Sequence, residues 1–227
     1  PTQESTNNLS DNNDDDDDDD DEQIVDIQQR VQVSNIVYDT DDDIKSIYGN
    51  NGLKRVFKIE NNKKGNYKVE YKDKKKEILD YSNIGNYSPK IKLLLKNIKK
   101  SDGIVLVYSR YLASGIIPIA IALEHLGFHK FGGKNILNGG TRESKKGNYI
   151  IISGNTYLSP NNTDEITECT NKNNKDGDKI KVILITESGT EGLDLKNVRE
   201  IHIFDPWYNL NRLEQVIGRG VRNFSHI

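Results

Sequence analysis

The sequence contains little sulfur, because a single cysteine, Cys169, and no methionine occur in its 227 residues. One cysteine excludes an intramolecular disulfide and a cysteine-rich zinc site, and such low usage is typical of a reducing compartment. The four histidines show none of the spacings that metal ligands use, so we expect no metal site. Because even position 1 is not methionine, we expect the chain to be a fragment of a longer protein.

Long apolar runs are also absent from the sequence. None reaches the ~20 residues that a membrane-spanning helix requires, and no secretory signal is visible. We therefore expect a protein that stays inside the cell and has no membrane partner.

Charge is distributed unevenly along the chain. Residues 1–22 carry eleven acidic residues and no lysine or arginine, and an aspartate run fills positions 14–21. This run repels itself and buries nothing, so residues 1–22 are predicted to be a disordered acidic tail, either a solvated linker or a competitor for a basic groove. Because the whole chain has a net charge of −3, residues 23–227 carry +8, which permits nucleic-acid binding.

Residues 23–87 are highly charged and weakly patterned. Alternation in 54–60 and 67–72 favours a hairpin around residues 61–66. The segment is predicted to be a charged linker that carries a hairpin appendage outside the core.

Helix and strand signals alternate from Ser88 onward. Ser88 and Pro89 begin an amphipathic helix, and further helices are expected at 116–126 and 163–169. Apolar runs predict strands at 103–108, 149–152, 181–186 and 200–204, while 130–147 resembles a loop or insertion. Strands that are apolar on both faces and alternate with helices indicate a parallel sheet covered on both sides. We therefore predict an α/β domain over residues 88–227.

Polar residues follow each of the four predicted strands. They are Ser109 and Arg110, then Ser153 and Gly154, then the segment 188–194, and finally Asp205 and Trp207. Because ligands of open parallel sheets bind at the carboxyl ends of the strands, this edge is the predicted site.

The last predicted helix begins at Asn209 or Asn211. Gln215, Arg219 and Arg222 share one face of it, and the apolar residues lie on the opposite face. Glycines 218 and 220 each cost about 1 kcal/mol relative to alanine inside a helix. The arrangement fits a polyphosphate site or, alternatively, a solvated basic face on a packing helix.

The order of these segments resembles the second RecA-like domain of superfamily 2 helicases. GIVLVYSR at 103–110 resembles motif IV, SGTEGLDL at 188–195 resembles motif V, and QVIGRGVR at 215–222 resembles motif VI. The similarity is closer to helicases of nucleocytoplasmic large DNA viruses, of the poxvirus early transcription factor small subunit and nucleoside triphosphate phosphohydrolase I type. It covers about 150 residues, 80–227.

The resemblance implies a nucleotide site. Arg222 would be an arginine finger on the γ-phosphate, Arg219 would contact the phosphates or the first lobe, and Gln215 would position the nucleotide or the attacking water. The residues that would border the nucleotide are Gly192, Asp194 and Gly218. For Asp194 a helix cap or a salt bridge to Arg219 is the structural alternative.

The resemblance also implies a nucleic-acid contact at the predicted edge. The residues that would touch the backbone, or couple it to hydrolysis, are Ser109, Arg110, Ser153, Gly154, Ser188 and Thr190. Trp207 is better interpreted as a packing anchor than as a base-stacking residue. DNA is favoured over RNA as the partner, and an RNA polymerase or other transcription complex is a further partner that the resemblance implies.

No G-x-x-x-x-G-K-[ST] loop and no D-E-x-[HD] box occur, and Gly132-Gly133-Lys134 lacks the required spacing. The cofactor that the resemblance implies is ATP with Mg²⁺, whose ligands would lie in an N-terminal RecA-like lobe outside these residues. We therefore interpret the chain as the C-terminal motor lobe of an ATP-dependent nucleic-acid helicase or translocase. If the chain is viral, the expected location is the virion or the host cytoplasm. The alternative is a catalytically inactive lobe that binds nucleic acid or a transcription complex.

Overall fold

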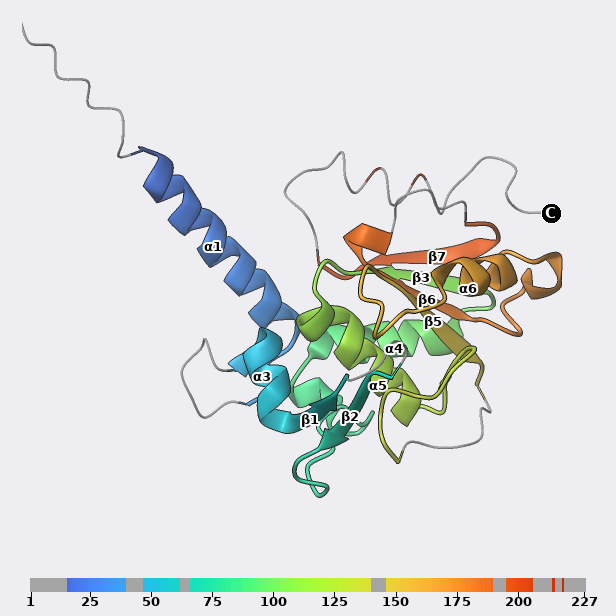
Figure 1. Ribbon diagram of the computed structural model, residues 1–227, viewed down its shortest axis with the longest axis horizontal. Coiled ribbons are helices and arrows are strands. Elements are labelled where there is room, and N and C mark those ends of the chain that lie inside the picture. The colour runs from blue at the N-terminus through green and yellow to red at the C-terminus, as the bar shows by residue number, and fades with distance from the viewer. Residues whose placement is uncertain are drawn as a thin grey trace, which may run out of the picture.

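The computed structural model describes residues 16–39, 47–61, 66–139, 146–189, 195–205, 214 and 218. At its centre lies a five-stranded sheet with the strand order β4-β5-β6-β3-β7 (Figure 1). The strands are β3 (Ile104–Tyr108), β4 (His129–Lys130), β5 (Asn148–Ile152), β6 (Val182–Ile185) and β7 (Val198–Ile203). All neighbouring strands pair in parallel. The predicted parallel α/β sheet is therefore confirmed.

The register aligns the carboxyl ends of the four longer strands. Tyr108 pairs with Ile185 on one side and with Ile203 on the other, and Ile152 also pairs with Ile185. The residues that follow these strand ends therefore emerge along one edge of the sheet.

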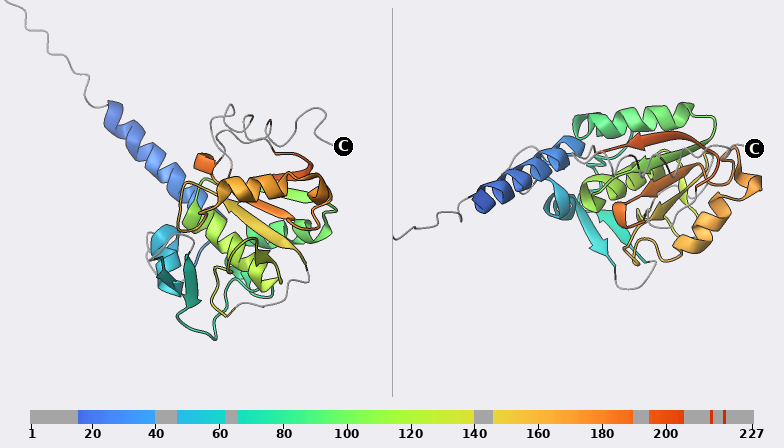
Figure 2. Two further views of the ribbon diagram at one scale, coloured as in Figure 1. Left: turned by 45° about the vertical axis from the view of Figure 1, so that its right-hand side comes forward. Right: turned by 90° about the horizontal axis from the view of Figure 1, so that it is seen from above.

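The two faces of the sheet have separate hydrophobic cores. Val105 and Val107 of β3 face a large cluster with α4 (Pro89–Lys100) and α5 (Ile117–His125), whereas Ile104 and Leu106 face a smaller cluster with α6 (Asn162–Cys169). Figure 2 shows α4 and α6 on opposite sides of the sheet. Burial of each such side chain contributes about 1.5–3 kcal/mol, so a strand buried on both faces must be apolar at every position.

Helices α4 and α5 begin with the signals that the sequence predicts. Ser88 caps α4 by accepting a hydrogen bond from the Ile91 N–H at 3.0 Å, and Pro118 lies in the first turn of α5. A π-helical turn, Leu112–Ile116, precedes α5. Residues 117–124 are all buried, which explains why α5 has no polar face. Its one acid, Glu124, accepts hydrogen bonds from the N–H groups of residues 136 and 137, both at 2.7 Å.

The segment before Ser88 differs from the predicted appendage. The hairpin is present, with β1 (Phe57–Glu60) antiparallel to β2 (Lys68–Tyr71), and α3 (Gly49–Val56) precedes it. However, its apolar side chains belong to the large core cluster of the sheet, namely Ile36, Tyr38, Leu53, Phe57, Val69 and Tyr71. Val69 also exchanges backbone hydrogen bonds with the loop at 136–138. The segment is rich in charge, but these apolar side chains are buried, so charge alone gave too peripheral a prediction.

Helix α1 (Asp16–Asn35) projects from the body of the molecule (Figure 1). It begins inside the acidic stretch that was predicted to be disordered, and residues 1–15 of that stretch lie outside the described residues. None of the helices in the described ranges is long and apolar enough to cross a membrane.

The remaining described elements are short. They are the 3-10 turns Ile84–Asn86, Lys172–Asn174 and Glu187–Gly189, of which the last follows β6 directly. Of the predicted closing helix, only Glu214 and Gly218 are described, and both are helical and exposed.

Candidate functional site

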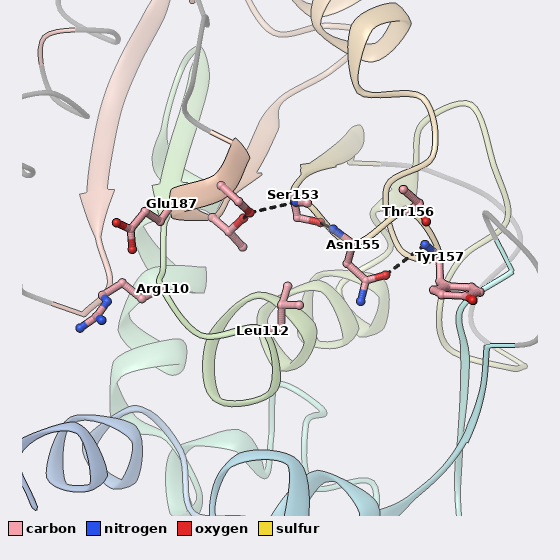
Figure 3. Close-up of a pocket in the computed structure, with 10 residues that line it drawn as sticks. Arg110, Leu112, Ser153, Asn155, Thr156, Tyr157 and Glu187 are labelled. Atoms are coloured by element: carbon pink, nitrogen blue, oxygen red, sulfur yellow. Dashed lines mark hydrogen bonds between the residues drawn. The ribbon is translucent and has the colours of Figure 1, made fainter. Parts of the chain in front are cut away.

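A pocket of about 650 Å³ opens at the carboxyl edge of the sheet (Figure 3). Its walls come from the segments that follow β3, β5 and β6, and the residues lining it are Arg110, Leu112, Ser153, Gly154, Asn155, Thr156, Tyr157, Thr186, Glu187 and Ser188. The structure thus brings four of the predicted nucleic-acid residues to one pocket: Arg110, Ser153, Gly154 and Ser188. Their contact with a ligand remains a prediction.

Ser188 joins the segments after β5 and β6. Its hydroxyl accepts a hydrogen bond from the Gly154 N–H at 3.0 Å and lies 3.1 Å from the Thr186 hydroxyl. A Cβ atom at position 154 would lie 3.0 Å from that hydroxyl, so glycine permits the close approach. Gly154 and Ser188 are both exposed, which leaves this junction accessible to a ligand.

The structure places Ser109 apart from this pocket. Ser109 is 0% exposed, and its hydroxyl donates to the carboxylate of Asp205, which is also 0% exposed. The same carboxylate accepts the backbone N–H of Arg110 at 2.8 Å and the side-chain amide of Asn35 at 3.2 Å. Ser109 therefore links the ends of β3 and β7 through this hydrogen bond. Its neighbour Arg110 lines the pocket instead.

Asp205, Ser109 and Asn35, which are buried, form a polar cluster with the half-buried Lys90, and we call it the Asp205 cluster. The Lys90 ammonium donates to the Asn35 side-chain oxygen at 2.6 Å and lies 5.0 Å from the centre of the Phe204 ring. Burial raises the pKa of Asp205, and the surrounding donors and Lys90 oppose that rise. Burial likewise lowers the pKa of Lys90, and Asp205 opposes that change. Each group thus offsets part of the desolvation cost of the other.

The π-helical turn at residues 112–116 packs directly on the Asp205 cluster. A Cβ atom at Gly115 would lie 2.0 Å from the Ser109 hydroxyl, so this position requires glycine. The adjacent Ser114 hydroxyl accepts the N–H of Gly49 at 2.9 Å, which connects the turn to α3. Single π-turns of this kind are frequent at functional sites.

A second cavity of about 640 Å³ adjoins the first, because Arg110, Leu112 and Asn155 line both. Its other walls come from α1, α3 and the hairpin, through residues such as Gln32, Lys54 and Tyr67. Sequence analysis missed this half, since no motif marks those residues. The two cavities extend the site from the end of β5 to the segment that had been predicted to be an appendage.

Most of the predicted nucleotide residues lie outside the described residues. These are Gln215, Arg219, Arg222, Gly192 and Asp194, and the same holds for Thr190 and Trp207. Gly218 is described, and a Cβ atom there would meet nothing within 4 Å. Within the described ranges, no group of three or more histidine, cysteine, aspartate or glutamate side chains is placed to hold a metal ion.

A parallel sheet flanked by helices, with a polar pocket at its carboxyl edge, is the architecture expected of the class of RecA-like lobes. The chain belongs to one family of that class, since residues 89–224 match the helicase conserved C-terminal domain. The resemblance to helicases of large DNA viruses is confirmed by the relatives that the comparison finds.

Two relatives illustrate the similarity. The chain is 38% identical over 151 residues, 66% of its length, to "Putative ATP-dependent RNA helicase R563" of Acanthamoeba polyphaga mimivirus, of which it spans 25%. It is 34% identical over 170 residues, 62% of its length, to "Termination factor NPH-I homolog" of an African swine fever virus isolate, of which it spans 24%. The chain thus spans about a quarter of the length of these curated relatives. No solved structure matches it.

Proposed function

We propose that this domain is the C-terminal motor lobe of an ATP-dependent nucleic-acid helicase or translocase, and that the nucleic acid crosses the carboxyl edge of the sheet. The observation that carries the proposal is the convergence of Arg110, Gly154 and Ser188 at one open pocket of a helicase C-terminal domain. These residues come from three different strand ends, so the sheet fixes their relative positions.

The pocket has the groups that a nucleic-acid backbone requires. Phosphate oxygens are bound by guanidinium groups and hydroxyls, and Arg110, Ser188 and Thr156 supply these two types. Glu187 lies at the Arg110 end of the pocket (Figure 3) and repels phosphate there. We therefore expect the phosphate to contact the Arg110 guanidinium from the side of Gly154 and Thr156, away from the Glu187 carboxylate.

ATP with Mg²⁺ would bind mainly to an N-terminal lobe, and Arg222, Arg219 and Gln215 would complete the site when the lobes close. The family match includes all three residues. Gly218, with open space beside its Cα, fits close approach by a ligand.

DNA is the proposed substrate, and transcription is the proposed process. The support is the similarity to a viral protein named as a termination factor, while another relative is named as an RNA helicase. Titration of matched DNA and RNA oligonucleotides at several salt concentrations would separate the two substrates.

The test of the motor proposal is the ATPase activity of the complete protein with Arg222→Ala. Loss of an arginine finger is expected to lower kcat by about 10³-fold or more, since it stabilises charge that grows in the transition state. The affinity for nucleotide should change far less. Turnover close to that of the unaltered protein would refute the arginine-finger role, and an unaltered protein without ATPase activity would favour the inactive binding module.

A further inference from the structure

The aromatic ring of Tyr157 is exposed at the rim of the pocket. Its side chain is 42% exposed, whereas the other large exposed apolar residues among those described, Ile27 and Leu93, lie on helices α1 and α4. Within the residues that the structure describes, neither a ring nor a cation stacks on Tyr157. One face of the ring is therefore available to a ligand that enters the pocket.

The backbone around Tyr157 is held firmly. The Asn155 side-chain oxygen accepts the N–H groups of Tyr157 at 3.0 Å and Leu158 at 3.2 Å, and the Asn155 carbonyl accepts the Ser159 N–H at 2.8 Å. Leu158 is fully buried in the large core cluster. Because its two neighbours on the carboxyl side are buried, Tyr157 cannot turn inward without breaking this turn. Because the backbone at this position is already fixed, stacking of a ligand on the ring costs little backbone entropy.

Tyr157 and Arg110 lie at opposite ends of the pocket (Figure 3). Between them stand the Gly154–Ser188 junction and the exposed Thr156. The pocket thus has a cation at one end, an aromatic ring at the other end, and the hydroxyl groups of Ser188 and Thr156 between them. This combination matches a nucleotide, whose phosphate requires donors and whose base offers a flat π-surface.

We infer that the Tyr157 ring stacks on an unpaired base of the bound strand. The inference rests on the proposed function, because it assumes that nucleic acid occupies this pocket. Bases inside a duplex are already stacked on their neighbours and cannot present a face to the ring. The pocket therefore selects single-stranded over double-stranded nucleic acid, and it does so without base preference because every base has a π-face.

The test measures the binding of fluorescein-labelled oligonucleotides of about 12 nucleotides, a length within the range that single-strand sites cover. The 227-residue chain is titrated with four probes: single-stranded DNA, single-stranded RNA of the same sequence, the DNA duplex, and a DNA strand of abasic nucleotides. Fluorescence anisotropy at low salt reports the dissociation constants. The DNA and RNA arms show which backbone the site accepts.

Tyr157→Ala is expected to weaken binding of the base-bearing single strand about tenfold, the lower part of the range for loss of one stacked base. Binding of the abasic strand should not change, so the preference for bases over abasic sites disappears. Tyr157→Phe keeps the ring and should bind within about twofold of the unaltered chain. Leu93→Ala, which removes an even more exposed apolar side chain from α4, is the matched control and should have no effect.

Several outcomes would overturn the stacking role. Unchanged binding by Tyr157→Ala would show that the ring does not stack on a base. Equal losses of affinity in Tyr157→Ala and Tyr157→Phe would show the same. Equal weakening of the abasic and base-bearing strands would point to a backbone contact. If the unaltered chain bound none of the four probes, the proposed function would fail as well. If the unaltered chain bound the single strands and Tyr157→Ala bound them equally well, only the stacking role would be overturned.

Discussion

The two halves of the carboxyl edge of the sheet use similar residues in opposite ways. At the ends of β3 and β7, Ser109 and Asp205 are completely buried and hydrogen-bonded to each other. At the ends of β5 and β6, Gly154 and Ser188 are exposed, and their hydrogen bond forms the wall of an open pocket. A polar residue that follows a buried parallel strand is therefore not by itself evidence of ligand contact.

The difference arises from what packs against each half. The end of α1, through Asn35, and the π-helical turn at Gly115 cover Ser109 and Asp205, which are both 0% exposed. The described segments leave the β5 and β6 ends open. Substitutions in the first half should change the free energy of unfolding, and substitutions in the second half should change ligand binding.

The largest expected effect is that of Asp205→Ala. It leaves the donors on Ser109, Asn35 and Arg110 unpaired and Lys90 without a nearby carboxylate, so the free energy of unfolding should fall by about 3 kcal/mol or more. Urea denaturation of the 227-residue chain measures this change. Asp102→Ala removes an exposed aspartate and should change stability by less than about 0.5 kcal/mol. A stable Asp205→Ala variant with impaired nucleic-acid binding would contradict the division between the two halves.

Gly115→Ala should have the next largest effect. The added Cβ atom conflicts with the Ser109 hydroxyl, and overpacking of this kind costs about 1–3 kcal/mol. Gly133→Ala is the matched control, because a Cβ atom there meets nothing within 4 Å. Combining Gly115→Ala with Ser109→Ala removes the clashing oxygen. The double-mutant cycle should therefore show a favourable coupling, and purely additive losses would show that the two residues do not meet.

Arg110→Ala should have the smallest effect on stability but a clear effect on binding. Its backbone N–H, which Asp205 accepts, is retained, while the guanidinium at the pocket is lost. The affinity for nucleic acid should fall several-fold, and the slope of log K against log salt should decrease by about one. Arg199→Ala removes an exposed arginine near the start of β7, at the opposite edge, and serves as the control. An unchanged salt slope for Arg110→Ala would exclude a phosphate contact.

Periodicity and turn chemistry predicted the elements that have strong local signals. The bounds of β3, β5, β6 and β7 agree with the predicted apolar runs to within one or two residues. Ser88 caps α4 as expected. Strand β4 was missed because its two residues, His129 and Lys130, form no apolar run. The order of the strands across the sheet also has no local signature.

The site was predicted in part. Arg110, Ser153, Gly154 and Ser188 were placed at the correct edge, because parallel strands bring their carboxyl ends together. The hydrogen bond between Asn35 and Asp205 joins residues 170 positions apart, and nothing in either local sequence indicates it. Ser109 and Arg110 are adjacent in the chain, yet only the packing of α1 and Gly115 decides that one is buried and the other lines the pocket.

The attachment of α1 has a mechanical consequence. Twenty residues of helix form a rod of about 30 Å, and its last residue, Asn35, is bonded to Asp205 and Lys90. A rod fixed at one end is a lever, so a tilt of about 10° at Asn35 would displace the far end by about 5 Å, given that length. Conversely, a load on the outer end of α1 is transmitted through Asn35 to Asp205, which follows the carboxyl end of β7.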